Sequence, residues 1–143
     1  MKYVAELLKK KGNDIWSVVP DTPVYQALQL MSDKNCGAVL VLKNEKLVGI
    51  LSERDYARKV ILKGKSSKDT PVEEIMSSKV VCILPTRTID HCMALMTDKR
   101  VRHLPVMEEE GTLVGLISIG DVVKEVISEQ EFIINQLENY ISS

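Results

Sequence analysis

Two short segments of the sequence place a glycine, a serine and an aspartate at the same spacing. The first is Gly49-Ile50-Leu51-Ser52-Glu53-Arg54-Asp55, and the second is Gly115-Leu116-Ile117-Ser118-Ile119-Gly120-Asp121. A serine hydroxyl can donate to a phosphate, and an aspartate can accept hydrogen bonds from both hydroxyls of a ribose. The glycine, which has no side chain, would let a ligand approach the backbone closely. The pattern therefore suits a nucleotide.

The same residues also have a purely structural explanation. A serine at a helix N-cap with an acid three residues later resembles a capping box, which is a common way to start a helix. A helix N-terminus also offers unpaired N–H groups and the positive end of the helix dipole, both of which favour a phosphate. Glutamate or glutamine would close a capping box as well as aspartate, so the recurrence of aspartate at 55 and 121 favours the ribose role. Both interpretations stay open at this point.

The two segments are parts of an internal repeat. Leu30-Met31-Ser32-Asp33-Lys34 returns as Leu95-Met96-Thr97-Asp98-Lys99, at an offset of 65 (30 to 95). After one inserted residue near Gly111 the offset becomes 66, and residues 47–52 match residues 113–118. Each copy predicts the order strand, helix, strand, strand, helix. We therefore expect an α+β fold of two pseudo-symmetric repeats, each a small β-sheet packed against two helices.

The first strand and helix of each copy are predicted from apolar runs and prolines. Residues 18–19 and 80–84 predict strands that end at a proline. In the first copy Thr22 is the expected N-cap, with Pro23 at the first helical position. Apolar side chains at helical spacing then predict the buried stripes, namely Val24, Ala27, Leu28 and Met31 in the first copy, and Ile89, Cys92, Met93 and Met96 in the second.

Two apolar runs separated by a polar turn predict a hairpin in each copy, over residues 38–42 and 47–51, and over 104–107 and 113–117. Val4, Leu7 and Leu8 predict a short helix that ends near Gly12, with residues 9–11 as its solvated basic end. We therefore expect four parts along the chain. They are the N-terminal helix with repeat 1 (residues 1–64), a linker (65–79), repeat 2 (80–128) and a C-terminal helix (129–143). The apolar residues from Val122 to Ile141 exceed what a small domain buries, which suggests a subunit contact.

The composition limits the classes of function that we expect. With 143 residues, 45% of them hydrophobic and 27% charged, the chain has the composition of a folded globular domain. The net charge of −1 gives no reason to expect nucleic acid or a membrane as a partner. No apolar run approaches the ~20 residues that span a bilayer, and no signal-peptide core is present near the N-terminus, so we expect a cytoplasmic protein. The three cysteines form no C-x-x-C pair, and we expect small buried apolar residues rather than zinc ligands.

The tandem repeat and both Gly-x-x-Ser-x-x-Asp segments resemble a pair of cystathionine-beta-synthase (CBS) domains, also called a Bateman module. The segment Val101-Arg102-His103-Leu104-Pro105-Val106 resembles the same family, and the likeness covers roughly residues 1–128. Small stand-alone proteins with two CBS domains are the most similar type. The resemblance implies a regulatory module that binds AMP, ADP or ATP, or in some members NAD or S-adenosylmethionine. It also implies a homodimer that regulates an unidentified partner protein.

The resemblance further implies two equivalent clefts built across the repeats. In the first, Asp55 would hold a ribose and Ser52 would contact the same nucleotide. Its adenine would lie against Val80, Val81 and Val101, and its phosphates would meet Arg102, helped by Arg54 or His103. In the second cleft, Asp121 and Ser118 would take the ribose side, and the base would be lined by Ile15, Trp16, Cys36, Gly37 and Ala38. Packing of Trp16 in the core is the alternative to base contact.

The two implied clefts differ in charge. Arg102, His103 and Arg54 correspond to Gly37, Ala38 and Gly120 in the other copy. We therefore expect the Asp55 cleft to prefer a phosphorylated ligand, and the Asp121 cleft to bind weakly, to bind a neutral group, or to stay empty.

The sequence bears on three classes of function: an enzyme, a regulatory module and a scaffold protein. No serine, cysteine or histidine has an identifiable catalytic partner in the sequence, so catalysis is not expected. A nucleotide-sensing regulatory module is favoured. The alternative is an interaction or scaffold protein that keeps the fold without binding a ligand, and the intact serine and aspartate in both copies argue against it.

Overall fold

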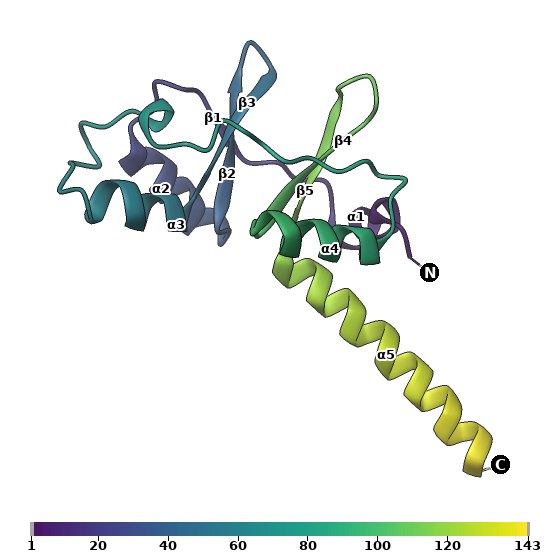
Figure 1. Cartoon of the computed structure of the whole chain (residues 1–143). Helices are drawn as coiled ribbons and strands as arrows, with labels where there is room; N and C mark the ends of the chain where they lie inside the picture. Colours follow the sequence, from purple (N-terminus) through teal and green to yellow (C-terminus); the bar gives the residue numbers. More distant parts are fainter. Residues whose placement is uncertain (1, 143) are drawn as a thin grey trace. The chain divides into compact units, whose positions relative to one another are not determined.

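The computed structural model describes residues 2–142, which form two compact units. Unit 1 comprises the described residues up to Asn13 together with those from Val81 onward, and unit 2 is Asp14–Val80. The helices and small sheets of both units confirm the α+β prediction (Figure 1).

Unit 2 contains the first repeat. Its elements are β1 (Ser17–Val18), α2 (Val24–Lys34), β2 (Ala38–Lys43), β3 (Lys46–Ser52), α3 (Glu53–Tyr56), the π-helical turn η1 (Ala57–Ile61) and the 3₁₀ turn η2 (Val72–Glu74). The sheet order is β1-β2-β3, with β1 parallel and β3 antiparallel to β2. Asn44 and Glu45 join β2 to β3 with φ of 52° and 65°. Positive φ at both central residues fits the twist of a two-residue hairpin, which confirms the predicted turn.

Unit 1 contains the second repeat and the N-terminal helix. Its elements are α1 (Val4–Lys11), α4 (Ile89–Lys99), β4 (His103–Met107), β5 (Leu113–Ser118) and α5 (Ile119–Ser142). The predicted strand over residues 80–84 is wrong in extent, since only Ile83 forms a parallel bridge, with Val106. Ile83 N–H donates to Pro105 and Met107 N–H donates to Ile83. Pro105 has no N–H with which to continue this ladder, so the strand pairing ends there.

Helix α1 completes the core of unit 1. Val4, Leu7 and Leu8 are at most 5% exposed and lie in one apolar cluster with Leu104 and Ile117. The backbone fixes the start of this helix, because Val4 N–H donates to the carbonyl of Arg87 and Ala5 N–H to that of Pro85. The domain boundaries predicted from the sequence placed this helix with the first repeat. In the structure it packs against the second repeat instead.

Two details of the predicted helices are wrong. The N-cap of α2 is Pro23 rather than Thr22, whose Oγ1 instead accepts a hydrogen bond from Val19 N–H. In α4, Ile89, Cys92 and Met96 are buried as expected, but Met93 is 38% exposed. Met93 lies at the edge of the apolar stripe, where a helical side chain is only partly covered.

The glycines of the two segments make room for the chain itself. A Cβ on Gly49 would lie 2.4 Å from Met76 Sδ, and a Cβ on Gly115 would lie 2.7 Å from Leu8 Cδ2. The expectation that these glycines admit a ligand is therefore wrong, because the side chains of Met76 and Leu8 already fill the space.

Replacing Leu8 by alanine tests this packing. The change removes a side chain buried against Gly115 and leaves a cavity between α1 and β5. We expect a loss of roughly 2–5 kcal/mol in the free energy of unfolding of unit 1. Chemical denaturation measures the loss, with Lys9→Ala on the exposed face of the same helix as the control. Equal stability of the two variants would show that α1 contributes little to the core.

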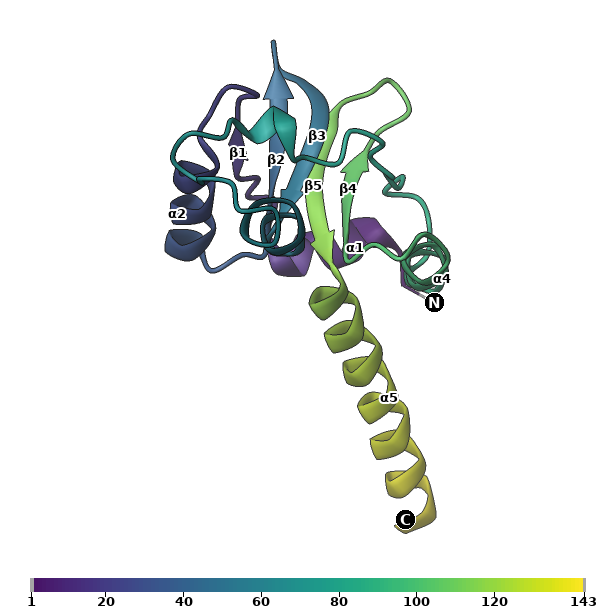
Figure 2. The ribbon, with the colours of Figure 1, turned by 60° about the vertical axis from the view of Figure 1, so that its left-hand side comes forward.

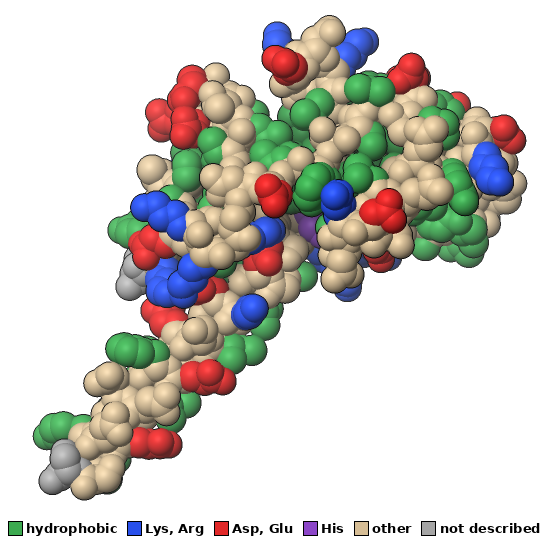
Figure 3. Space-filling view, turned by 180° about the vertical axis from the view of Figure 1, so that it is seen from behind, with side chains coloured by type: hydrophobic (Ala, Val, Ile, Leu, Met, Phe, Trp, Pro, Cys, Tyr) green, Lys and Arg blue, Asp and Glu red, His purple; other side chains and the backbone are tan. Residues whose placement is uncertain are grey.

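The last helix extends past the remainder of its unit. Figures 1 and 2 show α5 continuing away from β4 and β5 rather than folding back over them. Its buried residues, Val122 and Glu125, are in its first two turns. Farther along, apolar side chains are exposed on the protruding part (Figure 3), and the exposed fraction is 63% for Phe132 and 57% for Leu137. The predicted separate helix over 129–143 is thus the continuation of the second helix of repeat 2.

Candidate functional site

Ser52 and Asp55 form a capping box at the start of α3. Ser52 Oγ accepts a hydrogen bond from Asp55 N–H at 3.1 Å, and Asp55 Oδ2 accepts one from Ser52 N–H at 3.0 Å. Ser52 Oγ also lies 3.0 Å from the same carboxylate oxygen. The capping box expected as the structural alternative is therefore formed. The cap engages Oδ2 of Asp55, and Oδ1 is not part of it.

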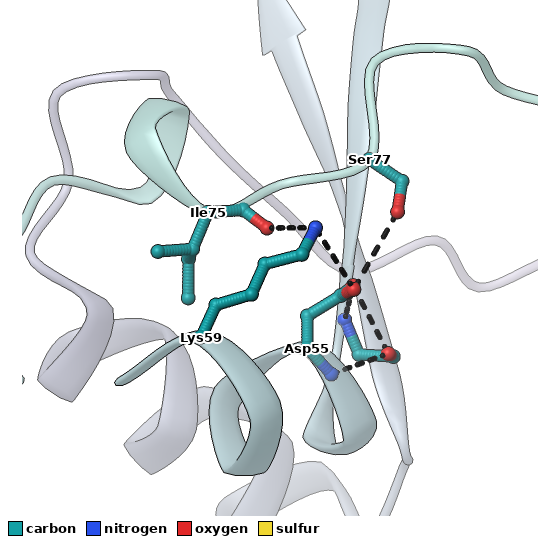
Figure 4. A network of polar contacts seen from close by, with 5 residues as sticks. Asp55, Lys59, Ile75 and Ser77 are labelled. Atoms are coloured by element: carbon teal, nitrogen blue, oxygen red, sulfur yellow. Dashed lines mark hydrogen bonds and ion pairs between the residues drawn. The ribbon is translucent and has the colours of Figure 1, made fainter. Parts of the chain in front are cut away.

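The second oxygen of Asp55 faces a small polar network (Figure 4). Ser77 Oγ lies 3.5 Å and Lys59 Nζ 3.5 Å from Oδ1. Lys59 also donates to the carbonyl of Ile75 at 3.0 Å, so its ammonium is held from two sides. The Asp55 side chain is 15% exposed. A half-buried carboxylate with hydroxyl and ammonium neighbours can exchange one of these contacts for a ligand hydroxyl.

The other predicted site residues of unit 2 have varied surroundings. Arg54 is exposed on α3, and Ala38 is buried at the start of β2. Ile15 and Val80 are partly buried. Trp16 packs against the core of unit 2, with Lys34 Nζ 4.4 Å from its ring centre, so the core-packing alternative holds for at least part of this ring.

Cys36 and Gly37 lie at a hollow of unit 2. A cavity of about 540 Å³ is lined in part by these two residues together with Leu28, Asn35, Glu53 and Tyr56. Its walls are the C-terminal part of α2 and the start of α3. The predicted base-lining residues 36 and 37 therefore lie at an open concavity, whereas Ala38 does not line it.

In unit 1, Ser118 and Asp121 repeat the capping geometry. Asp121 Oδ2 accepts a hydrogen bond from Ser118 N–H at 2.9 Å, and Ser118 Oγ accepts one from Asp121 N–H at 3.2 Å. Lys11 Nζ lies 2.5 Å from the same carboxylate oxygen. Burial alone would raise the pKa of Asp121, but the bonds from Lys11 and from Ser118 N–H outweigh it and hold the pKa below its usual value. The carboxylate is therefore ionised at neutral pH.

Arg102 and His103 flank this second site. The carbonyl of Arg102 accepts Ile119 N–H at 2.8 Å, and His103 pairs with Ser118 across β4 and β5. Burial lowers the pKa of His103, and the positive charges of Lys11 and Arg102 lower it further, against the opposing charge of Asp121. His103 is therefore neutral at pH 7 and would serve a phosphate as a hydrogen-bond donor. The predicted base contacts Val81 and Val101 are partly buried and pack on the core of unit 1.

The two sites are equivalent in backbone as well as in sequence. Glu53 N–H donates to the carbonyl of Gly37 at 3.1 Å, as Ile119 N–H donates to that of Arg102. Gly37 and Arg102 therefore occupy equivalent backbone positions in the two repeats, as the alignment of the two copies predicts. One position has no side chain and the other carries a guanidinium.

Sequence reasoning missed three residues at these sites. Lys59 and Ser77 contact Asp55, and Lys11 contacts Asp121. Lys59 could have been found, because it follows Asp55 by one helical turn. Ser77 and Lys11 lie outside the repeated segments, so comparing the two copies gave no signal for them.

No helix within residues 2–142 has the length and apolar character needed to span a membrane. Over the same residues, no cluster of three or more His, Cys, Asp or Glu side chains is arranged to hold a metal ion. Burial raises the pKa of the Cys92 thiol to about 11, which keeps it protonated at neutral pH.

Comparison with known proteins identifies the family. The family model of the CBS domain matches residues 4–62 and 72–128. The chain is 39% identical over 148 residues to the CBS domain-containing protein CBSX3, mitochondrial, of Arabidopsis thaliana, covering 96% of this chain and 71% of that protein. A structure of a protein with CBS domains from Burkholderia ambifaria MC40-6 is 51% identical, with a TM-score of 0.86 over 90% of this chain and 96% of that one.

A second structure is similar in fold. The CBS domain pair of protein MJ0100, in complex with 5′-methylthioadenosine and S-adenosyl-L-methionine, has a TM-score of 0.80 at 20% identity and covers 90% of this chain and 98% of that one. With two family matches that cover most of its length and the same order of elements in each copy, the chain belongs to the CBS domain family and is a tandem CBS pair.

Proposed function

We propose that the chain is a regulatory module that binds an adenine nucleotide, AMP, ADP or ATP, and acts on a partner protein through a change in conformation. The supporting observation is that both copies present an aspartate whose carboxylate is bonded to a capping serine and to a lysine. A capping box needs no lysine. Polar side chains gathered twice at a helix N-terminus suit the hydroxyls and phosphates of a nucleotide.

Both molecules in the complex of the MJ0100 pair contain adenosine. At 20% identity this pair supports the fold of this chain rather than its ligand. NAD and S-adenosylmethionine are therefore retained as alternative ligands. We propose a regulatory rather than a catalytic role, because the serine and aspartate of each site bond one another as a helix cap.

A thermal-shift panel tests the proposal. A ligand that binds only the folded state stabilises it by about 2.7 kcal/mol at a concentration 100 times its dissociation constant. For a chain of this size we expect the melting temperature to rise by roughly 5–10 °C with AMP, ADP or ATP at a few hundred micromolar. GMP at the same concentration controls for non-specific anion effects. An unchanged melting temperature with every nucleotide, NAD and S-adenosylmethionine would favour the scaffold alternative instead.

We also infer that the module works as a homodimer joined through α5. The apolar residues Val123, Ile127, Ile134, Leu137 and Ile141, with Gln130 between them, are spaced alternately by four and three residues along this helix. This spacing is typical of helices that pair with one another. All five apolar side chains are at least 43% exposed in the isolated chain. A second copy would cover them.

The regulatory mechanism depends on how ligand binding is coupled to the conformation of the chain. A ligand shifts a conformational equilibrium only by the difference between its affinities for the two states. Ser118 and Asp121 lie at the first turn of α5, so a ligand held there contacts the helix whose far end carries the exposed apolar residues. We infer that occupancy biases the arrangement of α5 and that a partner protein recognises it. A location in the cytoplasm stays a prediction, since the Arabidopsis relative is named as mitochondrial.

A further inference from the structure

Lys11 is bound at the Asp121 carboxylate, although it belongs to neither repeated segment. Its Nζ lies 2.5 Å from Asp121 Oδ2 and also donates to the carbonyl of Leu116 on β5. The two side chains are 29% and 26% exposed. The ammonium therefore occupies a half-buried place at the residue that, in the proposed function, accepts the ribose hydroxyls.

Lys11 lies at the end of a helix, where its side chain can turn without disturbing the helical backbone. Lys11 is the last residue of α1, and Gly12 after it has φ of 99°, which ends the helix. A lysine ammonium is a compact point charge on a flexible four-carbon stem, so it can turn to another anion within several ångströms. Lys59 at the Asp55 site is likewise bonded to a backbone carbonyl, that of Ile75, but it lies 3.5 Å from its carboxylate rather than 2.5 Å.

The surroundings of Asp121 favour an added anion. The backbone carbonyl of Arg102 lies at the start of α5, and the positive charges of Arg102 and Lys11 both act on His103, which lies across from Ser118. The first turn of α5 adds the positive end of a 24-residue helix. The Lys11 ammonium neutralises the Asp121 carboxylate, so the helix N-terminus leaves partial positive charge for a ligand phosphate.

We propose that Lys11 makes the Asp121 site selective for phosphorylated ligands over uncharged nucleosides. The proposal rests on the proposed function, which assigns the ribose to Asp121. A nucleoside that bonds Asp121 displaces the ammonium and offers it no other anion. A nucleotide displaces the same ammonium but supplies a phosphate to which it can bind.

The test uses the full chain with Asp55→Ala, which leaves the Asp121 site as the site under study. Adenosine and AMP are titrated by calorimetry into this background, alone and combined with Lys11→Met, Lys11→Arg or Lys9→Met. We expect AMP to bind roughly tenfold more tightly than adenosine in the background, since a charge-assisted bond to phosphate is worth about that factor. Lys11→Met should bring the ratio to about one while adenosine binds as well as before or better. Lys11→Arg and Lys9→Met should keep the ratio.

The outcomes separate the two proposals. A ratio that survives Lys11→Met, or an equal weakening of both ligands, overturns the role of Lys11 and leaves nucleotide binding intact. Binding of neither ligand to the Asp55→Ala background instead refutes the assignment of Asp121 as a nucleotide site, and the role of Lys11 falls with it. Should Lys11→Met fail to fold, as shown by its melting curve, Lys11→Gln provides the same comparison with a polar side chain.

Discussion

Replacing Asp55 by alanine is expected to abolish nucleotide binding at its site. In the proposed complex the carboxylate accepts two hydrogen bonds from the ribose, and each bond to a charged group contributes about 1.5–3 kcal/mol. Their combined loss weakens binding roughly 100-fold or more, beyond the micromolar range expected for the wild-type protein. Titration calorimetry of AMP, ADP and ATP into both proteins measures the change.

A control separates this effect from a change in stability. Asp55 also closes the capping box with Ser52, so its loss can destabilise the start of α3 by about 0.5–2 kcal/mol. Ser52→Ala removes the hydroxyl of the same cap and keeps the carboxylate. If Asp55→Ala leaves the titration unchanged, the assignment of the site is refuted, whatever its melting temperature. If Ser52→Ala abolishes binding to the same degree, the carboxylate is not the dominant contact, because Ser52 contributes both to the cap and to the proposed site.

Deleting residues 129–143 is expected to convert a dimer into a monomer. The cut removes Ile134, Leu137 and Ile141, which are exposed in the isolated chain, and keeps the buried Val122 and Glu125. We therefore expect the apparent mass to fall by about half while the free energy of unfolding of the monomer changes by less than about 1 kcal/mol. Size-exclusion chromatography with light scattering, at tens of micromolar, measures the mass.

Point variants make this test specific to one face of α5. Leu137→Glu places a charge within the apolar spacing and should dissociate the dimer, whereas Asn135→Glu lies outside that spacing and should not. A strictly monomeric wild-type chain at these concentrations would contradict the proposed dimer. A dimer that persists after the deletion would show that another surface joins the two copies.

The repeated elements were predictable because their signals are local. Continuous apolar runs with a polar turn between them predicted both hairpins. A glycine after three lysines predicted the end of α1. The strand at 80–84 was not predictable in extent, since its pairing depends on a missing N–H at Pro105 in another part of the chain. The packing of Gly115 on Leu8 is likewise a contact between distant segments, which a local pattern cannot indicate.

The serine and aspartate of each site were identified from sequence, but their cationic neighbours were not. The comparison of copies indicated that the Asp121 site lacks a cation, because Arg102 and Arg54 correspond to Gly37 and Gly120. The structure supplies Lys11 there from α1, outside both copies. The expected contrast between a charged and an uncharged site is therefore weaker than the aligned residues suggest, and differential titration of AMP and adenosine decides how much of it remains.

The placement of α1 has a consequence for the order of folding during synthesis. Unit 2 is one uninterrupted stretch, Asp14–Val80, so all of its core residues have left the ribosome before most of unit 1 is made. Helix α1 precedes unit 2 in the sequence, yet its partners Leu104 and Ile117 are translated about a hundred residues later. An amphipathic helix of eight residues is marginal in water until it packs. Val4, Leu7 and Leu8 therefore stay uncovered until β4 and β5 have been made, and a chaperone that binds short apolar segments would find its target in α1.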